Sequence, residues 1–306
     1  MHHIIVNPTA GKRKSKKSLE AVKRVFDEGG ASYLIHETTR AGEAKEIAAR
    51  LTAPALPLET AGEVALIDVG RVEEPVKLII VGGDGTLHEV LNGISELSRC
   101  TLGLIPAGTG NDFAAAAGIP ENAEKAARII LKNEAKPIDC LEVGGLRSMN
   151  VAGLGIDVDV LVRCSKGKLK GKIKYLISLI QSLFTFKGYE ITVESGEKKE
   201  TFNGLIAAAC NGKKFGGGIK ICPVAEIDDG LMDVIMVDCL GGVFSIIKAF
   251  TWLMRGKILE YPLARHFRCE QVSVRTKNPC AAQLDGEVYE NLTFDAKICK
   301  GLTMYR

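Results

Sequence analysis

The chain has 306 residues, 46% of them hydrophobic, and a formal net charge of +3. This length can supply two domains with their own cores, the nearly balanced charge gives no positive reason to expect nucleic acid as a partner, and no apolar run reaches the roughly 18–20 residues that cross a bilayer. We therefore expect two domains, no nucleic acid, and only peripheral contact with a membrane.

Nine cysteines are scattered without a C-x-x-C spacing, and no charged-then-apolar leader with a cleavage site opens the sequence. This usage predicts reduced thiols and a cytoplasmic location. Cys140, Cys210 and Cys239 lie in strand-like runs, where a free cysteine is expected to act as a small apolar residue.

The first predicted elements alternate between strand and helix. A strand at 2–6 turns through Asn7-Pro8-Thr9-Ala10-Gly11-Lys12 into a basic helix at 15–28, and a strand at 32–39 precedes a helix at about 42–51. Residues 52–75 then form a long connection in which 63–69 could add a strand. Long connections are usually surface decoration or lids, and we assign this one no function.

A glycine-rich turn follows the apolar run Leu78-Ile79-Ile80-Val81. It consists of Gly82-Gly83-Asp84-Gly85-Thr86, and the helical spacing of Leu87, Val90, Leu91 and Ile94 comes next. Backbone N–H groups exposed at such a turn, beside a helix N-terminus, favour a phosphate. No Gly-Lys-Ser/Thr follows, so this is not the Walker pattern. The alternative is a tight turn in which Asp84 merely caps a helix.

A second strand ends in a similar way, at Pro106-Ala107-Gly108-Thr109-Gly110-Asn111-Asp112-Phe113. Two such turns on consecutive parallel strands would lie side by side at the carboxyl edge of a sheet, where open α/β sheets bind ligands. We therefore expect one site built from both motifs.

The two motifs together resemble the diacylglycerol kinase catalytic family, in particular the soluble bacterial lipid kinases related to sphingosine and ceramide kinases. Gly-Gly-Asp-Gly alone is shared with NAD kinases, but Thr-Gly-Asn-Asp-Phe is typical of the lipid kinases. The resemblance implies that Asp84 holds a catalytic Mg²⁺ and that ATP is bound by Asn7, Pro8, Gly11, Thr38, Gly82, Gly83, Asp84, Gly85, Thr86, Glu89, Gly108, Thr109, Asn111 and Asp112. A helix cap is an equally good interpretation of Thr38.

Beyond a polar stretch at 133–137 the pattern changes from alternating strands and helices to mainly strands, which marks a domain boundary. Predicted strands occupy 138–143, 147–155, 189–194, 204–211, 230–238, 266–275 and 292–300. We predict an α/β protein. A doubly wound α/β nucleotide-binding domain spans 1–136, and a β-rich sandwich domain spans 137–306; a return of the final residues to the first domain stays open.

Two apolar helices interrupt the second domain, at 173–184 and 244–255. The first follows alternating lysines from Lys166 to Lys174. Core packing with a solvated basic lead-in is one interpretation. The other is a peripheral anchor, with lysines on anionic headgroups and apolar side chains at the acyl boundary. Core packing is expected for the second helix.

The run from Asn211 to Val234 continues the resemblance, with a glycine-rich stretch at 216–218 and an Asp-Gly turn at 229–230. Similar bacterial enzymes hold a structural Mg²⁺ here, which would place Asp229 and the carbonyls of Glu226 and Leu231 around the ion. Hard oxygen ligands suit magnesium. An acidic turn without a metal is as good an interpretation.

The last short motif is Asp285-Gly286-Glu287. By itself it would be a solvated turn. In lipid kinases the corresponding glutamate reaches the cleft between the domains and accepts a proton, so the resemblance implies that Glu287 is the catalytic base.

The sequence therefore predicts an ATP- and Mg²⁺-dependent lipid kinase at the inner face of the membrane. Its leading acceptor is diacylglycerol and its product is phosphatidic acid. Sphingoid bases, monoacylglycerol or a polyprenol stay open as acceptors, and a homodimer is possible. The alternatives are an enzyme like NAD kinase and a non-catalytic module that binds nucleotide or lipid.

Overall fold

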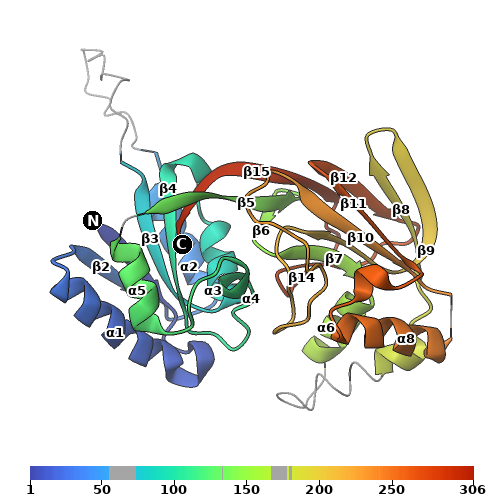
Figure 1. Ribbon diagram of the computed structural model, residues 1–306, viewed down its shortest axis with the longest axis horizontal. Coiled ribbons are helices and arrows are strands. Elements are labelled where there is room, and N and C mark those ends of the chain that lie inside the picture. Colours follow the sequence, from blue (N-terminus) through green and yellow to red (C-terminus); the bar gives the residue numbers. More distant parts are fainter. Residues whose placement is uncertain (55–73, 133, 167–177, 179–180, 241) are drawn as a thin grey trace.

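The computed structural model describes residues 1–54, 74–132, 134–166, 178, 181–240 and 242–306. Their strands form one continuous sheet in which β14-β13-β7-β9-β8-β12-β15-β4-β3-β1-β2 are successive neighbours, with β5, β6, β10 and β11 paired off this path. Parallel strands lie at one end of this path and antiparallel strands at the other (Figure 1).

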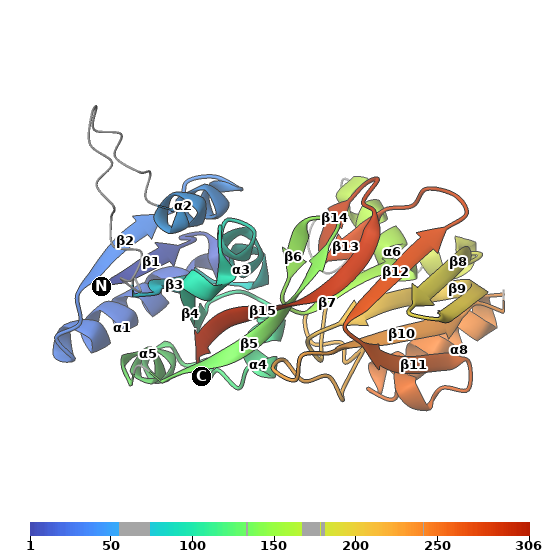
Figure 2. The same ribbon diagram turned by 90° about the horizontal axis from the view of Figure 1, so that it is seen from above.

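The N-terminal half has four parallel strands, β1 (His2–Val6), β2 (Tyr33–Glu37), β3 (Val76–Gly82) and β4 (Cys100–Pro106). Its helices are α1 (Lys14–Glu28), α2 (Glu43–Thr52), α3 (Asp84–Leu91), α4 (Asp112–Ala116) and α5 (Ala123–Leu131), with short 3-10 turns η1 (Ala10–Arg13) and η2 (Leu97–Arg99). Figure 2 shows α1 and α5 on one side of the strands and α2 and α3 on the other. Apolar residues at helical spacing, such as Leu19, Val22 and Phe26 of α1, face the sheet core.

The C-terminal half is β-rich. Its strands are β5 (Ala135–Val143), β6 (Leu146–Ser148), β7 (Val151–Gly155), β8 (Tyr189–Ser195), β9 (Lys198–Cys210), β10 (Met232–Asp238), β11 (Ala264–Cys269), β12 (Gln271–Thr276), β13 (Ala282–Leu284), β14 (Glu287–Tyr289) and β15 (Phe294–Tyr305). The helices α6 (Ile156–Lys166) and α8 (Val243–Met254) and the turn η3 (Ile258–Glu260) accompany them, and residues 181–185 are helical as well. An α/β half followed by a β-rich half confirms the predicted fold class.

Two long antiparallel strands, β5 and β15, run through both halves (Figure 1). Leu141 and Phe294 pack in a core of the C-terminal half, whereas Ile138 and Met304 pack in the core of the N-terminal half. The end of β15 pairs in parallel with β4. The boundary that we predicted between 136 and 137 falls inside β5, and it stays a prediction.

Two strands that we predicted as single are each divided. The segment 147–155 is split into β6 and β7 because the backbone N–H groups between them donate to the Asp285 carboxylate instead of a strand. The segment 266–275 is split into β11 and β12, so both segments were wrongly predicted as continuous strands.

Among the described residues, no helix is long and apolar enough to cross a membrane. The strand considered at 63–69 and most of the helix considered at 173–184 lie outside the described residues.

Candidate active site

Four predicted ligand turns emerge at one edge of the sheet, because β4, β3, β1 and β2 are parallel neighbours in that order. Val6 pairs with Val81 and with Glu37, and Gly82 pairs with Pro106. The turns carrying Asn7 and Thr38 and the two glycine motifs are therefore adjacent, at the edge where open α/β sheets bind ligands.

The two glycine motifs touch each other through their backbones. A Cβ atom added to Gly83 would lie 2.8 Å from the Gly108 Cα, so neither position has room for a side chain. Gly11 has a φ of +57°, and a Cβ there would lie 2.0 Å from the Ala107 carbonyl oxygen. Glycine is required at these positions because only a bare backbone permits this approach.

Asn111 shapes the second glycine motif. It adopts a left-handed conformation, with φ 54°, its Oδ1 accepts a hydrogen bond from the Gly108 N–H at 2.9 Å, and its Nδ2 donates to the Gly108 carbonyl at 3.1 Å. Asparagine tolerates this conformation better than most residues. The loop is thus closed on itself, which leaves Thr109 and Gly110 at its tip.

A polar cavity of about 270 Å³ lies beside the first turns, and Asn7, Thr38, Thr86 and Glu89 contribute to its lining. The Asn7 Nδ2 donates to the Thr86 hydroxyl at 3.4 Å. The Glu89 carboxylate accepts from the N–H groups of Gly42 and Ala44, at 2.9 and 3.2 Å, and so fixes the start of α2. Pro8 lies in the same turn as Asn7, shortly before η1.

A larger cavity of about 620 Å³ lies between the two halves. The N-terminal half contributes Asp84, Thr109, Gly110 and Asp112, and the C-terminal half contributes Asn150, Phe215, Gly216, Gly217, Asp285 and Gly286. Asp112 connects the halves because its Oδ2 accepts from the Gly217 N–H at 2.7 Å. The predicted catalytic carboxylate and the second glycine motif therefore face residues of the second half.

Asp84 is half-buried at the wall of this cavity. Its Oδ1 accepts from the Phe113 N–H at 3.2 Å. Burial raises the pKa of the Asp84 carboxyl, and the Asp112 carboxylate adds to the rise, although the N–H groups of Phe113 and Asp112 oppose it. A divalent cation would offset both the burial and the repulsion, so these two oxygen-donor side chains fit the predicted catalytic Mg²⁺.

Glu287 stands at the start of β14, exposed to solvent but close to the first glycine motif. Its Oε1 lies 3.6 Å from the position that a Cβ on Gly85 would occupy. Residues that are far apart in the sequence thus meet in one place. The proximity is compatible with the predicted role of Glu287, which stays a prediction.

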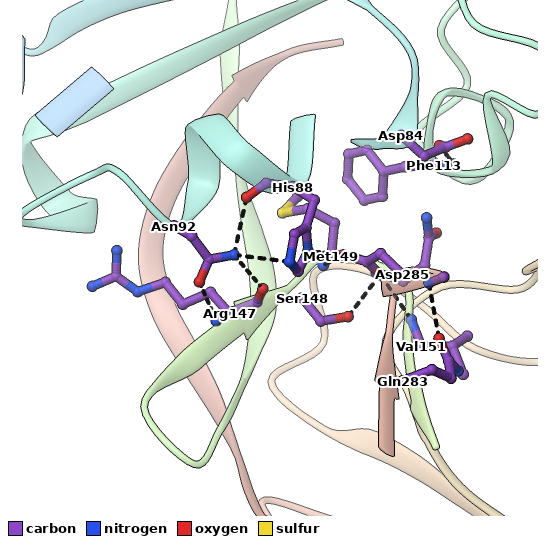
Figure 3. A network of polar contacts seen from close by, with 12 residues as sticks. Asp84, His88, Asn92, Phe113, Arg147, Ser148, Met149, Val151, Gln283 and Asp285 are labelled. Carbon is purple, nitrogen blue, oxygen red and sulfur yellow. Dashed lines mark hydrogen bonds and ion pairs between the residues drawn. The ribbon is translucent and has the colours of Figure 1, made fainter. Parts of the chain in front are cut away.

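Sequence reasoning missed the function of Asp285, the residue two positions before Glu287 in the same motif. Asp285 has a φ of 53°, and its carboxylate accepts from the Ser148 hydroxyl and from the N–H groups of Met149, Asn150 and Val151, at 2.7 to 3.2 Å (Figure 3). The turn therefore directs this side chain inward and leaves Glu287 to project elsewhere. An Asp-Gly pair in a turn was the only sequence signal.

The Asp285 carboxylate also reaches the N-terminal half. Its Oδ2 lies 3.2 Å from His88 Nδ1 of α3, and His88 Nε2 lies 2.7 Å from the Tyr289 hydroxyl. Burial would raise the pKa of the Asp285 carboxyl, but the interactions with His88, Ser148 and the Met149 N–H outweigh it and lower the pKa. The ionised carboxylate therefore joins α3 to the second half.

Asn92 and Arg147 make a second contact between α3 and the C-terminal half. The Asn92 Nδ2 donates to the Arg147 carbonyl and the Arg147 N–H donates to the Asn92 Oδ1, both at 2.8 Å (Figure 3). The Arg147 guanidinium also donates to the Ile94 carbonyl at 2.6 Å.

The predicted structural magnesium site has a cation partner within the protein. Asp229 Oδ1 accepts from the Leu231 N–H at 3.0 Å, and Oδ2 is paired with the Arg268 guanidinium. Magnesium would have to displace that guanidinium. The site at Glu226, Asp229 and Leu231 stays a prediction, and Arg268 weighs against it.

An apolar cavity adjoins the 620 Å³ cavity between the halves, and Phe215 lines both. It lies between α6, α8 and the sheet, and Asp157 is the one acidic residue among the described residues that line it. Asp157 Oδ1 is sealed from solvent and has no hydrogen-bond partner among the described residues. Burial raises the pKa of the Asp157 carboxyl to about 6, against smaller opposing contributions from backbone N–H groups.

Known proteins with similar sequences and structures are kinases by name. Residues 2–143 match the family model described as "Diacylglycerol kinase catalytic domain", and 150–302 match "YegS C-terminal NAD kinase beta sandwich-like domain". The diacylglycerol kinase of Bacillus subtilis (strain 168) is 31% identical over 289 residues, which cover 93% of this chain and 88% of that protein.

Two further relatives agree with these matches. A Xanthomonas euvesicatoria protein described as "Probable lipid kinase YegS-like" is 33% identical over 223 residues, covering 69% of this chain and 72% of its own. A crystal structure of a diacylglycerol kinase from Bacillus anthracis str. Sterne has a TM-score of 0.74 at 24% identity, with coverage of 99% and 96%. The latter likeness shows the same fold.

We expect Asp285→Ala to destabilise the protein by about 3–5 kcal/mol, because it removes the acceptor of three buried N–H groups and the partner of His88. Urea unfolding at pH 7 measures the change. Because the folded pKa of Asp285 lies below the ordinary value of 3.8, its contribution is present above that pH and is lost as the pH falls through the folded pKa. The free energy of unfolding of Asp285→Ala should therefore fall less than that of the parent as the pH drops through this range.

Asp295→Ala is the matched control, since this carboxylate pairs with Ser273 and Arg275 but its side chain is 49% exposed. We expect it to cost less than about 1 kcal/mol. Equal losses from the two variants would contradict the role assigned to Asp285.

We expect Asp157→Asn to stabilise the protein above pH 6 and to leave it unchanged near pH 4. The folded pKa of about 6 exceeds the ordinary value of 3.8, so the folded state holds the proton more tightly and stability falls as the pH rises between these values. The asparagine variant escapes this loss, on the order of 1–2 kcal/mol for a half-buried group. Urea unfolding at pH 4 and pH 8 tests it, and a variant less stable than the parent at pH 8 would refute it.

Proposed function

Because this chain belongs to the diacylglycerol kinase family, we propose that it is an ATP-dependent lipid kinase that transfers the γ-phosphoryl group to the hydroxyl of diacylglycerol, with phosphatidic acid as product. The observation that carries the proposal is the approach of Glu287 to Gly85 of the first glycine motif, next to Asp84 and Gly286, which line the cavity between the halves. An acid, a phosphate loop and an acceptor cavity are together what phosphoryl transfer to an alcohol requires.

The nucleotide would lie along the carboxyl edge of the parallel strands. Its nucleoside would enter the 270 Å³ cavity that Asn7, Thr38 and Glu89 line. Its phosphates would accept hydrogen bonds from the N–H groups of the two glycine motifs, beside the start of α3, where the helix dipole favours negative charge. The hydroxyls of Thr86 and Thr109 would donate to the same oxygens.

Glu287 would accept the proton of the acceptor hydroxyl as the new phosphate ester bond forms. Glu287 follows a left-handed turn that Asp285 anchors, and this turn would hold the Glu287 carboxylate toward Gly85. The carboxylate would stay solvated and therefore able to ionise. Asp84 would hold Mg²⁺, and the bound ion would neutralise part of the phosphate charge.

The acceptor would extend from the cavity between the halves into the apolar one. Phe215 lines both, so a hydroxyl near Glu287 and acyl chains between α6 and α8 would follow one continuous path. An apolar cavity with a few polar groups at its mouth is typical of sites for small amphiphilic molecules. The substrate would then be a lipid with a free hydroxyl at its polar end.

One face of α8 would contact the membrane that supplies this lipid. Phe244, Ile247 and Met254 are 90%, 42% and 56% exposed, and Leu240 just before the helix is 71% exposed. These helix positions lie on one side of α8, opposite Ile246 and Ala249, which face the core. Clustered exposed apolar side chains mark interaction surfaces, and this face of α8 would suit peripheral contact with the inner face of the membrane.

A homodimer stays a prediction.

Glu287→Gln should reduce turnover of diacylglycerol by about 100- to 10,000-fold, the usual contribution of a general base, with ATP affinity unchanged. Asp84→Ala should abolish turnover as well. Labelled ATP with a panel of diacylglycerol, monoacylglycerol, a sphingoid base and a polyprenol measures both the effect and the preferred acceptor. Glu290→Gln, an exposed glutamate three positions away, is the control and should keep full activity.

Full turnover by Glu287→Gln would reject Glu287 as the base. Phosphorylation of NAD in place of every lipid would reject the lipid-kinase assignment, and ATP binding without any product would favour a non-catalytic module.

The double variant Phe244→Ser with Ile247→Ser should bind vesicles of phosphatidylcholine and phosphatidylglycerol more weakly, by about 10-fold for each side chain removed from the acyl boundary. Co-sedimentation measures this, and activity on a water-dispersed short-chain diacylglycerol should be unchanged. Leu34→Ser, which alters a leucine of β2 that is 48% exposed, is the matched control and should bind like the parent. Unchanged vesicle binding by the double variant would exclude this face.

A further inference from the structure

A cluster of potential metal ligands lies outside the proposed active site, where β9, β10 and β11 are neighbours. Asp233 of β10 pairs with Cys210 of β9 on one side and with Arg268 of β11 on the other, and His266 is two residues before Arg268. Side chains at these positions project from the same face of the sheet. Cys222, from the loop that follows the glycines at 216–218, packs onto that face among the same core residues as Cys210.

The donor atoms of this cluster already converge. One ligand atom each of Cys222, Asp233 and His266 lies within 4.8 Å of the other two. Cys210 lies beside this group of three, because it pairs with Asp233 across the two strands and packs in the same core as Cys222. Ligand atoms around a tetrahedral zinc ion are separated by roughly 3.5–4 Å, as follows from bond lengths of about 2.0–2.3 Å. A small contraction of the three donor atoms would therefore fit an ion, and the Cys210 thiol would move in as the fourth ligand.

One carboxylate oxygen of the cluster has no partner in the described part of the chain. Asp233 is 1% exposed, and its Oδ1 lies 2.5 Å from His266 Nε2 and 3.7 Å from Arg268 Nε, but its Oδ2 is buried with no hydrogen-bond partner among the described residues. A buried carboxylate oxygen without a partner costs about 1–3 kcal/mol or more. Such atoms are rare in folded proteins, and a bound cation is one way to satisfy them.

Two buried thiols complete the cluster. Cys210 and Cys222 are both free thiols and completely buried. A soft or borderline cation would stabilise the thiolates and use the free carboxylate oxygen at once.

We propose that Cys210, Cys222, Asp233 and His266 hold a structural Zn²⁺ ion in a tetrahedral site of two thiolates, one imidazole and one carboxylate. Two sulfurs, one imidazole nitrogen and one carboxylate oxygen are zinc donors, whereas magnesium prefers oxygen ligands and water. His266, with a side chain 28% exposed, lies on the solvent side and gives the ion a way in. The oxygen ligands considered for magnesium, at Glu226, Asp229 and Leu231, are a different set.

The ion would anchor the loop that reaches the active site. Cys222 is five positions after Gly217, whose N–H donates to Asp112 at the cavity between the halves. Zinc would fix the far end of this loop to three strands of the sheet. Its function would be structural, because its ligands are not among the described residues that line that cavity.

The test uses the full chain, purified under reducing conditions without chelator. Elemental analysis should find one zinc ion per chain, and replacement with Co²⁺ should give a sulfur-to-cobalt charge-transfer band and the strong visible bands of a tetrahedral site. Cys222→Ser and His266→Ala should each weaken Zn²⁺ binding on the order of 100-fold or more and remove the tetrahedral Co²⁺ spectrum. Cys100→Ser, which alters another completely buried cysteine, is the control and should keep both.

A chelator gives a second readout that does not depend on kinase activity. It should lower the melting temperature of the parent and of Cys100→Ser, but not that of Cys222→Ser, because only the first two have an ion to lose. Folded parent protein that contains no zinc and gives no tetrahedral Co²⁺ spectrum would overturn the proposal. A disulfide between Cys210 and Cys222 in freshly prepared protein, found by thiol titration and mass spectrometry, would overturn it as well.

Discussion

The geometry of the site depends on one buried carboxylate. Asp285 satisfies three consecutive N–H groups at the junction of β6 and β7 and at the same time faces His88 of α3, so this one side chain ties the two halves together beside the site. A buried acceptor with this many donors is costly to disturb. Asp285 also lines the cavity between the halves, and it lies in the turn that leads to Glu287.

Local sequence patterns predicted the parts of the site that lie in single turns. The glycine motifs could be recognised because close backbone contact excludes side chains, as Gly83 and Gly108 show, and the alternation of strands and helices placed both motifs at one sheet edge. Glu287 was singled out only through a family resemblance. Its approach to Gly85 is a tertiary contact that no local pattern contains.

Other features could not be predicted because their partners are distant in sequence. Asp285 binds residues 134 to 197 positions away, and this divides a stretch that alternates like one strand into β6 and β7. Arg268, 39 positions after Asp229, occupies a carboxylate that had suggested magnesium. The cysteines that lie in apolar strand patterns gave no sign that Cys210 would meet Cys222, Asp233 and His266 across three strands.

The pairing of β15 with β4 has a consequence for the order of folding. Thr101 and Thr303 face each other across a sequence separation of 202 positions. While the ribosome makes the chain, β4 has an unpaired edge until those later residues emerge, and an open edge is a template for wrong partners. The N-terminal half would therefore complete its sheet late, and nascent chains would depend on chaperones or on rapid synthesis to avoid association through that edge.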